Sequence, residues 1–234
     1  MEAAVEYITQ LPPTPSAILG LSIANAVLYL LIARNAPSLP RTITKTASTA
    51  LLAAFAASVA GAQTRRLIAA LAFSAAGDAL LAWDEGDVAF LYALVCFLSS
   101  HILYIRLFFT RGHGAEFILS QSWRTGLAAA MALFTPGINY MLVSRVAGRG
   151  LQVHIVAYSV AILGMFLAAL TMDNAQIVTG ALLFTTSDAI LAADKFLVAR
   201  SSVLRAPLQY AVWVLYYVGQ ASITLGLLAF QKWP

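Results

Sequence analysis

Charged residues are scarce in this sequence. Lysine, arginine, aspartate and glutamate together make up 10% of the 234 positions, whereas 61% are hydrophobic and the mean hydropathy is +0.82. A soluble domain typically has roughly a quarter of its residues charged, and a disordered chain combines high charge with low hydrophobicity. Both classes are therefore excluded. Long apolar runs separated by short polar loops instead predict an all-α, polytopic membrane protein.

Cysteine and histidine are rare as well. Cys96 is the one cysteine, so no intramolecular disulfide can form. The histidines are scattered, and the sequence has no HExxH, CxxC, GxSxG or P-loop pattern, so we expect neither a metal nor a cofactor. An Asp/His/Asp set assembled in space is the one metal site that this composition leaves open. No basic run with interleaved aromatics occurs, which argues against nucleic acid as a partner.

Eight apolar segments are each long enough to cross a bilayer, which takes about 20 residues. The loops are too short to form a separate domain, so we expect residues 1–234 to form a single transmembrane bundle. The N-terminus lacks a basic n-region, so the first segment is expected to be a true span. The predicted spans are Ser16–Ala33, Ile43–Ala62, Leu67–Trp83, Val88–Phe109, Trp123–Val143, Leu151–Leu170, Ala175–Ala193 and Pro207–Phe230.

An even number of crossings places both termini on one face of the membrane. We call it face A and the opposite face B. Lysine and arginine are slightly more frequent in the loops of face B, which favours a cytoplasmic face B.

The third and seventh spans contain similar segments. Gly77-Asp78-Ala79-Leu80-Leu81 resembles Ser187-Asp188-Ala189-Ile190-Leu191 at an offset of 188 − 78 = 110 residues. Four spans separate equivalent points, and four crossings restore the direction of the chain. The similarity therefore indicates a parallel repeat of four plus four helices, unless it arose by chance between two apolar helices. The repeat would place both aspartates at the same depth, about 9 Å inside face B.

Asp78 and Asp188 are the main catalytic candidates. A carboxylate within the hydrocarbon costs roughly 2.5–3.5 kcal/mol on insertion scales and usually faces a polar interior. Two carboxyl groups that share one site divide into an acid and a base, although each aspartate could instead pair with a polar neighbour and only stabilise helix packing. His101 lies in the middle of its span and is expected to orient or share the proton.

Several polar residues within the spans are candidates for contact with a substrate. Lys45 opens the second span, where it either extends to the interface or binds a phosphate group. Aromatic residues usually gather at the membrane surfaces rather than in the centre, so a mid-span group is expected to face inward. The remaining candidates are Asn25, Tyr104, Tyr216, Tyr217 and Gln220.

Taken together, these motifs resemble those of the YhhN family of integral membrane proteins, which includes the eukaryotic lysoplasmalogenases. The resemblance covers nearly the whole chain, and its elements occur in the expected order. One departure is Ser100 before His101, where a small glycine is common. The matching elements are Lys45-x-x-Ser48-Thr49, Gly77-Asp78-Ala79-Leu80-Leu81, Phe97-x-x-Ser100-His101-x-x-Tyr104, Gly180-Ala181-Leu182-Leu183-Phe184-x-x-Ser187-Asp188 and Tyr216-Tyr217-x-x-Gln220.

The resemblance implies a membrane hydrolase that cleaves the vinyl ether bond of a lysoplasmalogen without a cofactor. In that reading Asp78 and Asp188 are the acid/base pair, and the substrate is a lysophospholipid taken from the bilayer. A lysophospholipid ester or another ether lipid remains an alternative substrate. The implied location is the endoplasmic reticulum in a eukaryote or the inner membrane in a bacterium. Buried carboxylates and a parallel repeat also suit a proton-coupled transporter, and a purely structural or lipid-binding bundle is a third possibility.

Overall fold

A computed structural model describes residues 2–59, 64–147, 150–199 and 201–229. In these ranges the chain forms ten α-helices and no strand, and eight of the helices are long and apolar enough to cross a membrane. The chain is therefore an integral, multi-pass membrane protein. The spanning helices are α2 (Pro13–Ile32), α3 (Leu39–Val59), α4 (Arg65–Trp83), α5 (Asp87–Arg111), α7 (Ser122–Arg145), α8 (Gln152–Ala169), α9 (Ala175–Phe196) and α10 (Arg205–Ala229).

The predicted spans are confirmed, and their ends differ from the observed helices by a few residues. The predicted ends at Ala62 and Phe230 lie outside the described residues. Two short helices were not predicted, α1 (Glu2–Thr9) and α6 (Ala115–Leu119). Each is too short to span a bilayer at 1.5 Å per residue, which is why hydropathy does not reveal them.

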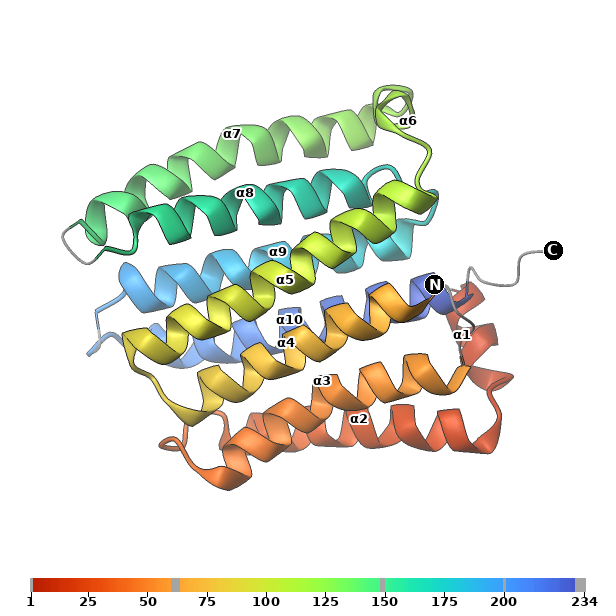
Figure 1. The fold of residues 1–234 in the computed structure, drawn as a ribbon, viewed down its shortest axis with the longest axis horizontal. Helices are drawn as coiled ribbons and strands as arrows, with labels where there is room; N and C mark the ends of the chain where they lie inside the picture. Colours follow the sequence, from red (N-terminus) through yellow and green to blue (C-terminus); the bar gives the residue numbers. More distant parts are fainter. Residues whose placement is uncertain (1, 60–63, 148–149, 200, 230–234) are drawn as a thin grey trace.

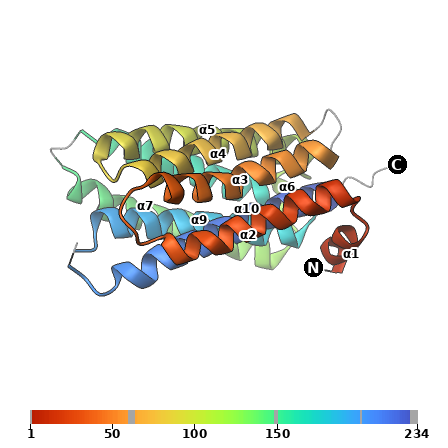
Figure 2. The same cartoon turned by 90° about the horizontal axis from the view of Figure 1, so that it is seen from below.

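The eight long helices run back and forth in one bundle, with helix axes along the horizontal direction of Figure 1. Helix α1 and the C-terminal end of α10 lie at the right-hand side of that view, which is face A. At the left-hand side, face B, α2, α4, α7 and α9 end and α3, α5, α8 and α10 begin. Figure 2 shows the bundle in layers, with α4 and α5 in one and α2, α10 and α9 in the other.

The packing of the helices agrees with a repeat of four plus four. In each half, α2–α5 and α7–α10, every helix packs against the next one along the chain. Between the halves, α5 packs against α8 and α10 packs against α3. Both of these contacts join the fourth helix of one half to the second helix of the other, so they are equivalent under the repeat. Helices α4 and α9, which contain the two aspartates, run in the same direction (Figure 1).

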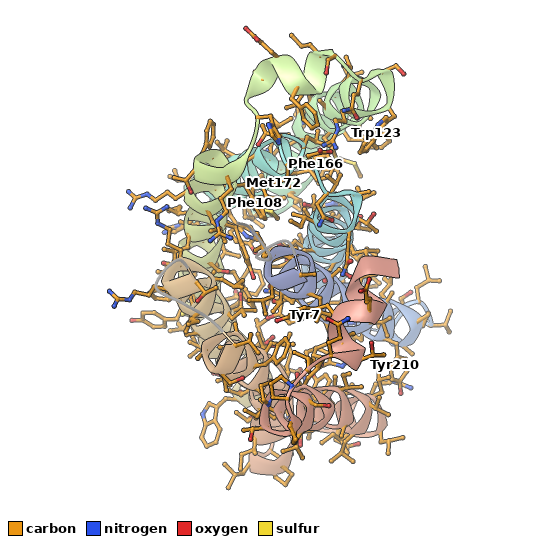
Figure 3. The ribbon with its side chains drawn as sticks, turned by 90° about the vertical axis from the view of Figure 1, so that its right-hand side faces the viewer. Tyr7, Phe108, Trp123, Phe166, Met172 and Tyr210 are labelled. Carbon is orange, nitrogen blue, oxygen red and sulfur yellow. The ribbon has the colours of Figure 1, made fainter. Side chains whose placement is uncertain are left out.

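Helix α10 occupies the centre of the bundle when the helices are viewed end-on (Figure 3). Its closest approach is to α9, where two glycines face each other. A Cβ added to Gly180 would lie 2.8 Å from the carbonyl oxygen of Gly219, and a Cβ on Gly219 would lie 2.8 Å from the carbonyl oxygen of Gly180. Small residues at such crossings let helix backbones touch in membrane proteins. This contact brings Tyr216 of α10 next to Phe184 of α9, with ring centroids 5.4 Å apart.

We expect Gly180→Ala to destabilise the bundle by about 1–3 kcal/mol, because the added methyl group meets backbone atoms that cannot move aside. Thermal unfolding of the purified protein in detergent measures the effect. Gly20→Ala in α2 is the matched control: nothing lies within 4 Å of a Cβ there, so its midpoint should stay the same or rise slightly. Equal midpoints for the two variants would contradict the close α9–α10 packing.

Candidate active site

Asp78 is buried inside the bundle and is 1% exposed. Its Oδ2 accepts a hydrogen bond of 2.7 Å from the Thr49 hydroxyl and one of 2.8 Å from the Tyr216 hydroxyl. Its Oδ1 lies 3.5 Å from the Nζ of Lys45. Lys45 and Thr49 are four residues apart on α3 and therefore project from one helix face. The buried carboxylate thus has a cation and two hydroxyl donors, as a charge in an apolar interior requires.

The ammonium group of Lys45 is held among aromatic rings. Its Nζ lies 5.8 Å from the ring centre of Tyr29 and 5.7 Å from that of Trp213, distances at which a cation is attracted to a π face. The Trp213 indole is itself fixed, since its N–H donates to the carbonyl of Ala26 at 2.9 Å. Lys45 therefore does not extend freely to the interface; it points from α3 into the bundle.

Asp188 forms a second cluster and is 6% exposed. Its Oδ2 lies 3.0 Å from His101 Nε2 and accepts a hydrogen bond of 3.1 Å from the Tyr158 hydroxyl. The imidazole of His101 is fully buried, stacks on Tyr158 at 5.3 Å and meets the edge of Phe184 at 4.8 Å. Among the described residues, its Nδ1 has no protein partner. A proton can be shared between the imidazole and the carboxyl group, and the rings around them prevent the imidazole from turning away.

The two clusters follow one pattern. Each aspartate bonds a residue from the preceding helix of its own half, Thr49 on α3 or Tyr158 on α8. Each also bonds a residue from the last helix of the other half, Tyr216 on α10 or His101 on α5. The pattern is what the parallel repeat predicts for equivalent sites. The chemistry of the sites differs, however: a lysine faces Asp78 and a histidine faces Asp188.

No hydrogen bond or ion pair joins Asp78 directly to Asp188 in the described part of the chain. The ring of Phe184 lies between the clusters and contacts both, at 5.4 Å from Tyr216 and 4.8 Å from His101. The aspartates therefore occupy neighbouring sites rather than one shared contact.

Tyr104 and Gln220 belong to a buried polar chain next to these clusters. The Tyr104 hydroxyl donates to Gln220 Oε1 at 2.6 Å, and Gln220 Nε2 donates to the Ser74 hydroxyl at 2.9 Å. Ser74 and Ser100 are hydrogen-bonded at 2.8 Å. All four side chains are fully buried, and they tie α5 and α10 to α4.

The other two predicted substrate contacts lie elsewhere. Tyr217 is hydrogen-bonded to Ser22 at 2.8 Å, and Ser22 donates to the carbonyl of Ser48 at 2.6 Å, so Tyr217 links α10 to α2 and α3. The Asn25 side chain donates to the Leu21 carbonyl of its own helix at 2.9 Å. The structure does not bring Asn25 to either aspartate.

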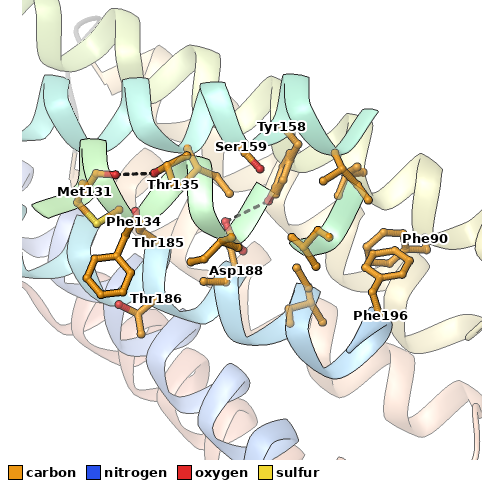
Figure 4. Close-up of a pocket in the computed structure, with 18 residues that line it drawn as sticks. Phe90, Met131, Phe134, Thr135, Tyr158, Ser159, Thr185, Thr186, Asp188 and Phe196 are labelled. Atoms are coloured by element: carbon orange, nitrogen blue, oxygen red, sulfur yellow. Dashed lines mark hydrogen bonds between the residues drawn. The ribbon is translucent and has the colours of Figure 1, made fainter. Parts of the chain in front are cut away.

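An apolar cavity of about 360 Å³ opens between α5, α7, α8 and α9. Figure 4 shows Asp188 at its wall with the hydrogen bond from Tyr158. Asp188 is the one charged side chain among the described lining residues. One turn before it, Thr185 also lines the cavity, and its buried hydroxyl has no partner in the described structure. The apolar part of the wall includes Phe90, Leu94, Met131, Phe134, Ile138, Leu142, Ile155, Ile162, Leu191 and Phe196.

A second cavity, of about 610 Å³, lies at face B and is rich in charged side chains; we call it the polar cavity. Lys45 lines it, so the Asp78 cluster connects to this cavity through its lysine. Phe90 and Leu191 line both cavities and mark the boundary between them. The charged lining residues are Arg41, Lys45, Asp84, Glu85, Asp87, Asp194, Lys195 and Arg205.

Sequence reasoning did not select Tyr158 or Thr185 as site residues. The repeat could have pointed to Tyr158. Tyr158 precedes Asp188 by 30 residues, and Thr49 precedes Asp78 by a similar 29 residues. No pattern marked Thr185, whose position depends on how α7 and α8 enclose the cavity. In the ranges that the structure describes, no group of three His, Cys, Asp or Glu side chains is placed to hold a metal ion.

The fold and the site together define a polytopic α-helical membrane protein with buried carboxyl groups next to two cavities. The family model of the YhhN family matches residues 40–227, most of the chain and all of the side chains that surround the aspartates. This chain therefore belongs to the YhhN family.

Curated relatives support the same assignment. The lysoplasmalogenase of Mycobacterium bovis is 28% identical over 186 residues, which are 79% of this chain and 68% of that protein. The Homo sapiens lysoplasmalogenase TMEM86B is 32% identical over 174 residues, which are 73% of this chain and 67% of the relative. The Bos taurus lysoplasmalogenase TMEM86A is 32% identical over 143 residues, 56% of this chain and 54% of the relative. No solved structure matches the chain at a significant level.

Lys45 and Asp78 should depend on each other for stability. Lys45→Met leaves a buried carboxylate without its cation, and breaking such a pair typically costs about 3–5 kcal/mol. The double variant Lys45→Met, Asp78→Leu removes both charges and should recover most of that loss. Thermal unfolding of the single and double variants in detergent forms a double-mutant cycle. Additive losses would show that the two groups do not interact.

Proposed function

We propose that this protein is a membrane hydrolase that cleaves the vinyl ether bond of lysoplasmalogens. The products are a fatty aldehyde and glycerophosphoethanolamine or glycerophosphocholine. Curated relatives named lysoplasmalogenase support this class of substrate. The observation that carries the proposal is a buried carboxyl group, Asp188, that is hydrogen-bonded to His101 and lines an apolar cavity.

The two cavities suit a lipid with one hydrocarbon chain. Phe90 and Leu191 line both cavities, so in the proposal the apolar cavity binds the chain while the polar cavity at face B binds the headgroup. Pockets that bind apolar ligands use a few placed polar groups to orient them, and here Asp188 is such a group. Helix α7 forms one wall of the apolar cavity and is mostly exposed on its other sides, so in the proposal the lipid enters beside α7 from the leaflet of face B.

The proposed reaction starts with proton transfer from Asp188 to the vinyl carbon that is not bonded to oxygen. The π electrons form the new C–H bond, and an oxocarbenium ion remains at the carbon bonded to the ether oxygen. Water adds to this carbon and passes a proton to the Asp188 carboxylate, which restores the acid. The hemiacetal then breaks its bond to the glycerol oxygen, which takes up the hydroxyl proton as the aldehyde forms. His101 holds the carboxyl group in place and shares its proton.

Asp78 is the second carboxylate of the proposed pair, and it acts next to the reacting atoms rather than on them. It holds Lys45 at the wall of the polar cavity, where the ammonium can bind the substrate phosphate as a point charge. Its negative charge also stabilises the positive charge that develops on the oxocarbenium ion. Such electrostatic stabilisation is strong in a site that excludes water.

In the proposal, Thr185 holds the attacking water. Its hydroxyl lines the apolar cavity three residues before Asp188 and has no partner in the described structure. A buried hydroxyl without a partner costs free energy, and a water between Thr185 and Asp188 would satisfy it. In the proposal this water adds to the oxocarbenium carbon.

Asp188→Asn is expected to reduce aldehyde release by about 100-fold or more, because a positioned acid contributes about 10²–10⁴-fold to rate. Asp78→Asn should also lose activity, since Lys45 then has no counter-charge. The assay is release of free aldehyde from lysoplasmalogen by purified protein in detergent or nanodiscs. Asp173→Asn, an exposed aspartate in the face A loop before α9, is the control and should keep the normal rate. Full turnover by Asp188→Asn would refute the proposal, and lipid transfer without aldehyde would favour a transporter.

Solvent isotopes test the chemistry independently of any variant. In D₂O the aldehyde should carry one deuterium on the carbon next to the carbonyl, because the transferred proton comes from solvent by way of Asp188. In H₂¹⁸O the aldehyde oxygen should be labelled before exchange sets in. Mass spectrometry of rapidly trapped aldehyde measures both labels. Unlabelled carbon in D₂O would contradict proton transfer to the double bond.

A further inference from the structure

The polar cavity at face B has ion pairs for most of its charges. Among the lining residues, Arg41 pairs with Glu85 at 3.3 Å, Lys195 with Asp87 at 3.3 Å, and Arg205 with Asp194 at 3.2 Å. Lys45 pairs with Asp78, which lies deeper in the bundle. A cavity whose walls are neutralised in this way does not simply attract one sign of charge.

Two groups of the cavity have unused capacity, and they are of opposite charge. Arg41 is 9% exposed, and its Nε has no partner in the described structure although its Nη1 bonds Glu85. Asp84 is exposed, and its carboxylate borders the same cavity without an ion pair among the described residues; it accepts the backbone N–H of Gly86 at 2.8 Å. A buried guanidinium donor with no acceptor is costly, and a bound anion would satisfy it.

We propose that this cavity binds the zwitterionic headgroup of a lysophospholipid, a phosphodiester that carries an ammonium group. The phosphate is bound by Arg41 and Lys45, and the ammonium by Asp84. The assignment rests on the proposed function and names the headgroup class that the site selects. Arginine recognises phosphate through several N–H donors, and lysine adds a point charge.

Four observations support this occupant, and the last two favour it over a simple anion. Lys45 and Arg41 lie four residues apart near the start of α3 and so project from one helix face. The first turn of α3 also presents the positive end of the helix dipole at face B. The unpaired Asp84 would repel a purely anionic ligand but attract an ammonium group. The cavity adjoins the apolar one at Phe90 and Leu191, so a headgroup here leaves its chain next to Asp188.

Binding of headgroup fragments to the full-length protein in detergent tests the proposal without relying on turnover. Isothermal titration at constant salt compares glycerophosphoethanolamine, glycerol phosphate, inorganic phosphate and ethanolamine. We expect glycerophosphoethanolamine to bind most tightly. Arg41→Gln should weaken it by about 10- to 100-fold, the range for one charge-assisted hydrogen bond, and Arg41→Lys should weaken it less.

Two further variants separate binding from structural effects. Glu85→Gln breaks the same Arg41 ion pair but frees the guanidinium, so it should leave affinity unchanged or raise it, whereas a merely structural role predicts that Arg41→Gln and Glu85→Gln behave alike. Asp84→Asn should weaken glycerophosphoethanolamine but not glycerol phosphate. Arg66→Gln, at face A and bonded to Thr110, is the control and should bind normally.

Each outcome decides one part of the proposal. Unchanged affinity for glycerophosphoethanolamine in Arg41→Gln would overturn the site. Inorganic phosphate that binds as tightly as glycerophosphoethanolamine, with no effect of Asp84→Asn, would overturn the zwitterionic headgroup and indicate a site for free phosphate. A protein that binds glycerophosphoethanolamine through Arg41 but releases no aldehyde would support this site while refuting the proposed hydrolysis.

Discussion

Burial of polar groups in an apolar bundle is the constraint on which the rest of this structure depends. A carboxylate that is out of contact with water needs hydrogen-bond donors or a cation from the protein itself. Asp78 and Asp188 both find them on helices from the opposite half of the chain, Tyr216 on α10 and His101 on α5. The aspartates therefore join the two halves of the bundle, and the α9–α10 glycine contact brings one of these partners, Tyr216, next to Phe184.

The repeat explains why the two sites are similar, and two side chains explain why they differ. Equivalent helices supply equivalent positions, yet Lys45 is present beside one aspartate and His101 beside the other. A lysine neutralises the charge of its carboxylate, whereas a histidine can exchange a proton with a carboxyl group. One arrangement of helices thus places a Lys–Asp pair beside the polar cavity at face B and a His–Asp pair beside the apolar cavity.

How far the site could be predicted depends on which physical signal each residue carries. Asp78, Asp188, His101 and Lys45 stand out because ionisable residues are expensive within apolar spans, and the structure places all four in the two clusters. Tyr104 and Gln220 were expected to contact a substrate, but they bond each other in the packed core. The difference arises because polarity shows that a side chain needs a partner without showing whether that partner is protein or ligand.

The sequence by itself determined the eight spans, their alternating direction and the equivalence of Asp78 and Asp188, because hydropathy and periodicity are properties of each segment alone. Only the tertiary structure decided which helices meet: that Asp78 and Asp188 lie in separate clusters, that Tyr158 joins the second one, that Thr185 lines the cavity beside it, and that Phe90 lines both cavities. These features depend on contacts between segments far apart in the chain, and no local pattern encodes the spacing and rotation of packed helices.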